Sequence, residues 1–316
     1  MKAERDGGGE SPEDGPTVAG NSIPERASAP SFTLFMPPRP PIPVLLAVPH
    51  AGRDYPPDLV ARLRQPELAT LRLEDRFVDL LAQNVAQETG VPLLVAHAPR
   101  AIIDLNRTPD DMDWEMVAGG RPANASRVAA GSRVRSGLGL IPRRLSSMGE
   151  IWRGRLTPEE VESRLEGVHR PYHAALAKGL EQLRDCWGGA LLIDLHSMPP
   201  LGARGEGVVG PEFVIGDRFG ASCAAHLSAT ALLHLAELGR PVAHNRPYAG
   251  GYVLERHGAP ARGVHAMQIE VCRSAYLDAK LREPGPGLAA TAKVLSSLIR
   301  RLAGELAGRG MAQAAE

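Results

Sequence analysis

The hydrophobic pattern of the chain alternates between two kinds of segment. Mostly apolar runs, typical of buried strands, occupy residues 43–49, 91–96 and 188–197, and a weaker run covers residues 100–104. Residues 268–271 form a further predicted strand, in which polar and apolar residues alternate. Between them, apolar residues recur every three or four positions, as in amphipathic helices, over residues 66–88, 157–184 and 221–238. Strands that alternate with helices predict the α/β fold class.

The start of one predicted helix is marked by capping chemistry. Thr157-Pro158-Glu159-Glu160 supplies an N-cap hydroxyl, a proline in the first turn and a glutamate three residues after the cap. These residue types satisfy the free N–H groups of a first helical turn. A helix is therefore expected to begin here and to run towards Arg184.

Two long segments fall outside this pattern. Residues 1–40 are rich in Gly, Pro, Ser and Glu, with too few large apolar side chains to offset the entropy lost on ordering. We therefore expect a disordered N-terminal tail over residues 1–40 and a single domain over residues 41–310. Periodicity also fails over residues 108–156, which predicts a long loop of the kind that is usually functional or mobile.

Composition narrows the classes of partner. The 36 basic residues balance the 36 acidic ones, and 43% of the chain is hydrophobic. The chain lacks the basic excess typical of nucleic-acid binding, and no apolar run approaches membrane-spanning length. Cys186, Cys223 and Cys272 are odd in number and widely spaced, which argues against a disulfide scaffold. We expect a cytoplasmic protein with no nucleic-acid or membrane partner.

Polar side chains suited to metal binding stand where predicted strands end. His50 follows the first apolar run, and Asp194 and His196 emerge at the end of the run over residues 188–197. Residues two apart on a strand point to the same face, so Asp194 and His196 should emerge together. A carboxylate beside a histidine is the pairing that orients a metal-bound imidazole. Taken alone, His50 is equally compatible with a loop or helix-capping position.

Two further segments carry side chains with recognition or acid–base chemistry. Asn106 and Arg107 lie side by side just past the weaker run, and a guanidinium suits bidentate recognition of a carboxylate. The alternative for Arg107 is a surface salt bridge. Glu270 alternates with apolar residues in a strand that is otherwise buried, and a buried carboxylate needs a partner or a catalytic role.

These segments belong to a longer series of ordered motifs. The series is Pro49-His50-Ala51-Gly52, Glu74-Asp75-Arg76-Phe77-Val78-Asp79, Asp104-Leu105-Asn106-Arg107, Pro171-Tyr172-His173, Asp194-Leu195-His196-Ser197, Asn245-Arg246-Pro247-Tyr248-Ala249-Gly250-Gly251-Tyr252 and His265-Ala266-Met267-Gln268-Ile269-Glu270. Over most of residues 43–282 it resembles the N-formylglutamate amidohydrolase family of the zinc carboxypeptidase-like group. The resemblance implies a three-layer α/β/α fold with a mixed central sheet.

The activity that the resemblance implies is metal-dependent hydrolysis of a linear amide. The expected substrate is N-formyl-L-glutamate or a similar N-acyl amino acid, and the products are formate and the amino acid, with a place in histidine degradation. The resemblance also implies that His50, Asp75 and His196 hold zinc and leave a fourth position for water. In related carboxypeptidases the acidic ligand follows the first histidine closely, which points to Asp54 as the alternative to Asp75.

The remaining site residues are carried over from the same motifs. Glu270 matches the general base that takes a proton from water at the metal. Asn106 and Arg107 would bind a substrate carboxylate, and Tyr248 would contact the substrate. Arg246 would bind the second carboxylate of glutamate or polarise the scissile carbonyl, and these two roles remain open.

Two other functions are compatible with the sequence. One keeps the zinc site in an aspartoacylase-like or carboxypeptidase-like hydrolase of another N-acyl amino acid or peptide. The other is a non-enzymatic metal-binding protein in which Glu270 is structural. In the loop over residues 108–156, Arg143 and Arg144 either cover the pocket or belong to a solvated basic segment. The sequence leaves the oligomeric state open.

Overall fold

The sheet at the centre of the molecule is mixed. The computed structural model describes residues 17–23, 26–122, 131–146, 148–202 and 210–313. Eight of the described strands form one sheet in the order β1-β4-β6-β5-β9-β12-β10-β11. Their bounds are β1 Thr17–Ala19, β4 Phe32–Phe35, β6 Leu93–Ala96, β5 Val44–Val48, β9 Ala190–Met198, β12 Val264–Cys272, β10 Phe213–Gly216 and β11 Val242–His244. Strands β6, β5, β9 and β12 run parallel, whereas β4 and β10 pair antiparallel with β6 and β12.

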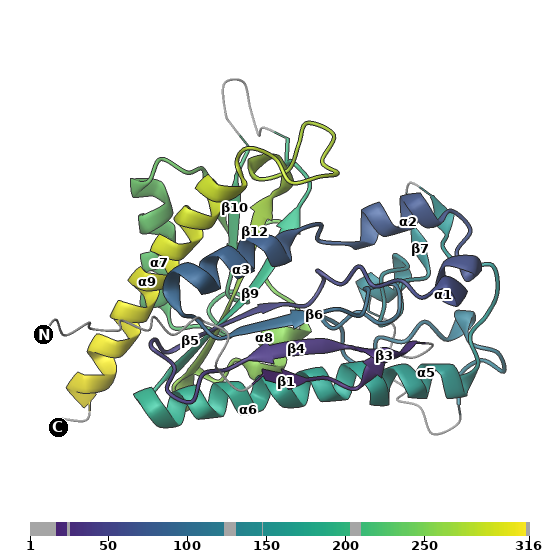
Figure 1. Cartoon of the computed structure of the whole chain (residues 1–316), viewed down its shortest axis with the longest axis horizontal. Helices are drawn as coiled ribbons and strands as arrows, with labels where there is room; N and C mark the ends of the chain where they lie inside the picture. The colour runs from purple at the N-terminus through teal and green to yellow at the C-terminus, as the bar shows by residue number, and fades with distance from the viewer. Residues whose placement is uncertain (1–16, 24–25, 123–130, 147, 203–209, 314–316) are drawn as a thin grey trace, which may run out of the picture.

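Helices cover both faces of this sheet, as Figure 1 shows. One face carries α3 (Val78–Thr89), α7 (Ala225–Glu237) and α9 (Leu288–Gln313), and the other carries α6 (Arg170–Trp187) and α8 (Tyr252–His257). Successive residues of a strand point to opposite faces, so Leu45 of β5 packs in the core on the α6 side and Leu46 in the core on the α3 side. The apolar runs are therefore strands buried on both faces, and the predicted three-layer α/β/α class is confirmed.

Shorter elements connect these layers. They are β2 Ser22–Ile23, β3 Arg26–Pro30, α1 Pro57–Arg62, α2 Pro66–Leu73, the 3₁₀ turn Trp114–Met116, α4 Ser132–Arg135, β7 Arg144–Leu145, β8 Gly149–Glu150, α5 Pro158–Arg164, the π-helical turn Leu165–His169, and the 3₁₀ turns Pro260–Arg262 and Arg273–Ala275. The loop expected over residues 108–156 thus contains short elements, and its residues 123–130 and 147 lie outside the described part. Among the described residues, no helix has both the length and the apolar character needed to cross a membrane.

The helix predicted over residues 66–88 is interrupted. It consists of α2 and α3, and the four residues between them leave the helical conformation. Glu74 is extended, with φ −77° and ψ 143°, and Phe77 adopts a left-handed φ of 56° before α3 begins. The Asp75 N–H donates to His50 O at 2.9 Å. The break therefore ties Asp75 to the end of β5, which a continuous helix could not do.

The helix predicted over residues 157–184 is confirmed and begins with the predicted capping box. Thr157 Oγ1 accepts from Glu160 N at 3.2 Å, and Glu160 Oε2 accepts from Thr157 N at 2.7 Å. Helix α5 continues through one π-helical turn, Leu165–His169, into α6. A π turn within an α-helix often occurs at functional sites, and here it carries His169.

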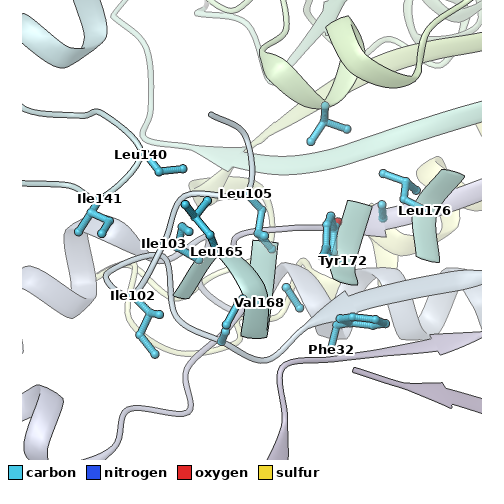
Figure 2. Packing of buried hydrophobic residues seen from close by; sticks show 14 of the residues in the cluster. Phe32, Ile102, Ile103, Leu105, Leu140, Ile141, Leu165, Val168, Tyr172 and Leu176 are labelled. Atoms are coloured by element: carbon cyan, nitrogen blue, oxygen red, sulfur yellow. The ribbon is translucent and has the colours of Figure 1, made fainter. Parts of the chain in front are cut away.

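Residues 100–102 form a turn and residues 103–104 have no regular structure, which corrects the expectation of a strand. The apolar side chains Ile102, Ile103 and Leu105 are buried in the core on the α6 side, where Figure 2 shows Leu105 close to Leu165. The polar residues between and after them face away from this core. The apolar side chains thus anchor an irregular segment firmly enough to position Asp104 and the residues that follow it.

Residues 17–23 and 26–40 correct the expectation of a disordered tail over residues 1–40. Residues 1–16 lie outside the described part of the chain, but β4 joins the main sheet beside β6, with Phe32 opposite Ala96. Phe32 is only 3% exposed, and its ring meets that of Tyr172 edge-on at a centroid distance of 5.9 Å. A segment with few apolar side chains is ordered here because those few are buried where the strand pairs with the sheet.

This packing predicts that Phe32→Ala lowers the free energy of unfolding by about 3–5 kcal/mol, because the change removes a buried aromatic ring and leaves a cavity. Val18→Ala in β1 is the control, since Val18 is 49% exposed and its replacement should cost less than about 0.5 kcal/mol. Urea denaturation of both variants gives the comparison. Equal stabilities would mean that β4 is not part of the cooperative core.

Candidate metal centre and active site

The end of the sheet at which the parallel strands terminate carries the titratable side chains. Strand β5 ends just before His50, and His196 lies near the end of β9. In the parallel pairing of β9 with β12, Glu270 stands opposite His196 and Gln268 stands opposite Asp194. Ligands of open α/β sheets bind in the crevice outside the carboxyl ends of the strands. This end of the sheet is therefore the candidate site.

His50, Asp75 and His196 converge into a compact cluster. Each offers one potential ligand atom, these atoms lie within 4.8 Å of one another, and all three side chains are buried. His196 Nδ1 lies 2.9 Å from Asp75 Oδ2, and His50 Nδ1 lies 3.7 Å from the same oxygen. The structure thus brings together the three residues expected as ligands, and the break between α2 and α3 supplies Asp75.

The second nitrogen of each imidazole is held by another buried carboxylate. His50 Nε2 lies 2.7 Å from Asp104 Oδ1, and His196 Nε2 lies 3.0 Å from Asp194 Oδ2. Because a carboxylate oxygen accepts, each Nε2 carries a proton and each Nδ1 faces Asp75. Sequence reasoning found the partner of His196 but missed that of His50, since Asp104 comes from a segment 54 residues away along the chain.

Charges within the cluster compensate one another. Burial would raise the pKa of Asp75, but hydrogen bonds with His196 and His50 hold it far below its usual value. Burial lowers the pKa of His196, yet Asp194 and Asp75 raise it well above its ordinary value. A proton therefore lies between His196 and Asp75. A divalent metal would satisfy the same atoms with positive charge, and two imidazole nitrogens with one carboxylate are a donor set that fits such a metal.

Glu270 lies beside the cluster as a buried carboxyl group. Burial raises its pKa to about 7, although the charge of His196 lowers it, and the charges of Asp75 and Asp194 raise it further. Gln268 Nε2, on the same face of β12, donates to Glu270 Oε1 at 2.9 Å. A carboxyl group with a pKa near neutrality can both accept a proton and return it.

A cavity of about 370 Å³ opens over the cluster, a volume within the range of roughly 300–1,000 Å³ that is typical of small-molecule sites. Its lining includes His50, Asp75, His196 and Glu270 together with Asn106, Arg107, Tyr248 and the arginines Arg72, Arg100, Arg133 and Arg273. Sequence reasoning singled out only Arg107 among these arginines. The others carry no local signal, because nothing in their sequence neighbourhood distinguishes a cavity arginine from a surface one.

Arg246 is the expected site residue that does not line this cavity. Its side chain is exposed, whereas Tyr248, two residues later, lies in the cavity wall. Asn245 has a left-handed φ of 58°, and its Nδ2 donates to Asp217 Oδ1 at 2.7 Å. Because this hydrogen bond turns the Asn245 side chain inward, the side chain of the next residue, Arg246, faces solvent. Arg246 thus lies outside the cavity lining in this structure, and its contact with the substrate stays a prediction.

The other residues left open by the sequence also lie elsewhere. Asp54 lines a different cavity and does not join the cluster that contains Asp75. Arg143 pairs with Asp113 at 2.6 Å, and neither Arg143 nor Arg144 lines the cavity over the cluster. Among the described residues of the loop over residues 108–156, Arg133 from α4 is the arginine that lines the cavity.

The Asn106 side chain is oriented by contacts on two sides. Its Oδ1 accepts from Val253 N at 2.9 Å, which leaves the Nδ2 group facing His196 Nε2 at 3.3 Å and Asp194 Oδ2 at 3.5 Å. Gly251 packs so closely that a β-carbon there would lie 2.5 Å from Asn106 Oδ1. The glycine leaves the space that the amide needs in order to turn towards the centre.

Two buried histidines fix the backbone of the Leu105–Arg107 segment. His173 Nε2 donates to the first carbonyl of this segment at 3.0 Å, and His169 Nε2 donates to the last at 2.9 Å. Since His173 Nε2 carries the proton, its Nδ1 accepts from His257 Nε2 at 3.0 Å. Burial lowers the pKa of all three imidazoles, which favours their neutral forms. The segment that lines the cavity is therefore held rigidly from behind.

Comparison with known proteins identifies relatives of the chain. The model of the N-formylglutamate amidohydrolase family matches residues 42–277. N-formylglutamate deformylases of Pseudomonas putida and Pseudomonas aeruginosa are each 31% identical to it, over 75% of this chain and 82% and 83% of their own lengths. The crystal structure of N-formylglutamate amidohydrolase from Ralstonia eutropha JMP134 matches with a TM-score of 0.78 and 33% identity, over 89% of this chain and 99% of that one.

The cluster predicts which substitutions abolish metal binding. His196→Ala and Asp75→Ala should each reduce the bound metal to near zero, because either change leaves only two of the three protein donors. Asp54→Ala is the control and should retain the metal content of the unmodified chain. Elemental analysis after dialysis measures all three, and stoichiometric metal in either of the first two variants would contradict this ligand set.

Proposed function

The chain belongs to the N-formylglutamate amidohydrolase family, and from that premise we propose that it hydrolyses the formamide of N-formyl-L-glutamate to formate and glutamate. The observation that carries the proposal is the convergence of His50, Asp75 and His196 beside Glu270 in one cavity. A donor set for a cation and a carboxyl group with a pKa near neutrality are the two groups that amide hydrolysis needs.

Zinc is the metal proposed for the His50, Asp75 and His196 donors. Zinc accepts neutral imidazole and carboxylate together, and catalytic zinc sites use three protein ligands and keep a further position open. When bound, the ion would supply a Lewis acid that polarises the formyl carbonyl and makes water more acidic. Asp104 and Asp194 hold the Nε2 atoms, which would leave both Nδ1 atoms available to hold the ion.

Glu270 is proposed as the group that moves the proton. Its Oε1 accepts from Gln268, which leaves Oε2 to take a proton from the attacking water and pass it to the departing amide nitrogen. The transfer of the proton to nitrogen matters because a neutral amine is a far better leaving group than the nitrogen anion that would depart without the proton. Burial, which raises the pKa of Glu270 to about 7, suits a group that must accept and then release one proton at neutral pH.

Asn106 and Arg107 are proposed to bind the α-carboxylate of the substrate. Arg107 Nε and Nη1 donate to the carbonyls of Leu138 and Asn106 at 3.0 and 2.7 Å, which fixes the guanidinium plane in the cavity wall. Tyr248 lines the same cavity, and burial raises the pKa of its phenol. It therefore remains a neutral hydrogen-bond donor that can contact the substrate.

The direct test is formate release from N-formyl-L-glutamate by the purified chain. We expect turnover that disappears when a chelator removes the metal and returns on addition of zinc. N-acetyl-L-glutamate should be hydrolysed at least about tenfold less efficiently, because one extra methyl group in a fitted pocket typically changes kcat/KM by about 10–200-fold. Equal turnover after complete metal removal, or a preference for the acetyl compound, would refute the proposal.

Glu270→Gln separates proton transfer from binding. The change preserves size and hydrogen-bonding reach but removes the basicity of the side chain. Bound metal should stay at the unmodified level, because Glu270 is not a proposed ligand, while kcat should fall by about 10²–10⁴-fold. Elemental analysis and formate release on the same sample provide both values. An undiminished kcat would leave the mechanism without its base, and loss of the metal would make Glu270 a ligand.

A further inference from the structure

The arginines of the cavity differ in what holds them. Arg100 lies 2.8 Å from the carboxylate of Asp104, and Arg273 donates to Ser197 Oγ at 3.1 Å and lies 3.5 Å from Asp75 Oδ1. The charges of these two arginines compensate the buried carboxylates around the metal ligands. They belong to the architecture of the centre and are not free to recognise a second anion.

Arg133 stands in a different situation. Its side chain is exposed at the mouth of the cavity, and in the part of the chain that the structure describes no carboxylate pairs with it. Its position is nevertheless fixed, because its carbonyl accepts from Leu138 N at 2.8 Å, and the Leu138 carbonyl in turn accepts from Arg107 Nε at 3.0 Å. The turn over residues 133–138 therefore contacts Arg107 and places Arg133 in the lining of the same cavity.

The two guanidinium groups repel each other across this space. Burial lowers the pKa of Arg107, and the positive charges of Arg100 and Arg133 lower it further against the pull of Asp104. Two like charges that face one cavity favour an anion between them or beside each of them. The arrangement is therefore suited to a ligand with more than one negative group.

We propose that Arg133 binds the side-chain carboxylate of a dicarboxylic N-acyl amino acid and so selects glutamate derivatives over neutral ones. This assignment rests on the function proposed above, in which Asn106 and Arg107 take the α-carboxylate. It also supplies the second cation that Arg246, exposed outside the cavity, does not provide.

The depth of each group decides which carboxylate it binds. Asn106 Nδ2 lies 3.3 Å from His196 Nε2, and the Arg107 side chain beside it is only 12% exposed. A substrate with its formyl group at the metal ligands carries the α-carboxylate one carbon from the amide nitrogen, hence deep in the cavity. The side-chain carboxylate lies two methylene groups farther out, towards the rim where Arg133 stands.

The test compares N-formyl-L-glutamate with N-formyl-L-glutamine, which has the same shape but a neutral amide in place of the side-chain carboxylate. Arg133→Ala should lower kcat/KM for N-formyl-L-glutamate by about 10–100-fold, as expected for the loss of a charged hydrogen bond. The loss should arise mainly from KM. The same variant should change kcat/KM for N-formyl-L-glutamine by less than about threefold.

Matched variants control for general effects. Arg135→Ala removes an exposed arginine from the same short helix that does not line the cavity, and it should leave both substrates unaffected. Arg72→Ala removes the other exposed arginine of the lining and should reduce the preference less than Arg133→Ala. The assignment would be overturned if Arg133→Ala lowered kcat/KM equally for both substrates or left the preference for N-formyl-L-glutamate over N-formyl-L-glutamine unchanged. It would also be overturned if only Arg72→Ala removed that preference.

Calorimetric binding of the same two compounds keeps this inference distinct from the proposed reaction. If the unmodified chain binds N-formyl-L-glutamate more tightly than N-formyl-L-glutamine, and Arg133→Ala removes that preference, the carboxylate site stands even if neither compound is hydrolysed. Binding that does not distinguish the two compounds would overturn the site, whatever the turnover of N-formyl-L-glutamate.

Discussion

Buried negative charge at the carboxyl end of the sheet is the constraint on which the rest of the centre depends. Asp75, Asp104, Asp194 and Glu270 are each at most 7% exposed, and a buried carboxylate is costly unless it is paired or hydrogen-bonded. Two imidazoles and two guanidinium groups meet that requirement for the aspartates. The same pairing turns both imidazole Nδ1 atoms towards Asp75, so charge compensation and the geometry of the proposed metal site have a single cause.

Irregular backbone is what allows these side chains to converge. The break between α2 and α3 brings Asp75 against the end of β5, and the turn over residues 99–103 brings Asp104 to His50. Neither segment is loose, because apolar neighbours such as Ile103 pack in the core on the α6 side (Figure 2). The hydrophobic core thus fixes a polar residue such as Asp104 because its apolar neighbours along the chain are buried in that core.

The arginines that line the cavity differ in the groups that hold them. Arg100 and Arg273 are tied to the carboxylates of Asp104 and Asp75, whereas Arg107 is fixed mainly by backbone carbonyls and Arg133 is exposed at the cavity rim. Arg72 also lines the cavity, and Arg107 itself lies 4.0 Å from Asp104 Oδ2, so three arginines besides Arg100 and Arg273 contribute positive charge to its wall. A proposed metal site at the base and cationic groups above it suit a small molecule with a neutral amide at one end and anionic groups beyond it.

Sequence alone determined the features that depend on neighbours along the chain. Apolar runs identified β5, β6 and β9, polar residues at strand ends marked His50 and His196, and alternation within a strand marked Glu270, because each of these is a local property of the chain. Only the tertiary structure placed Asp75 rather than Asp54 beside His50 and His196, paired Asp104 with His50, and placed Arg133 rather than Arg246 in the cavity lining. These outcomes depend on contacts between segments far apart in sequence, which no local pattern of residues records.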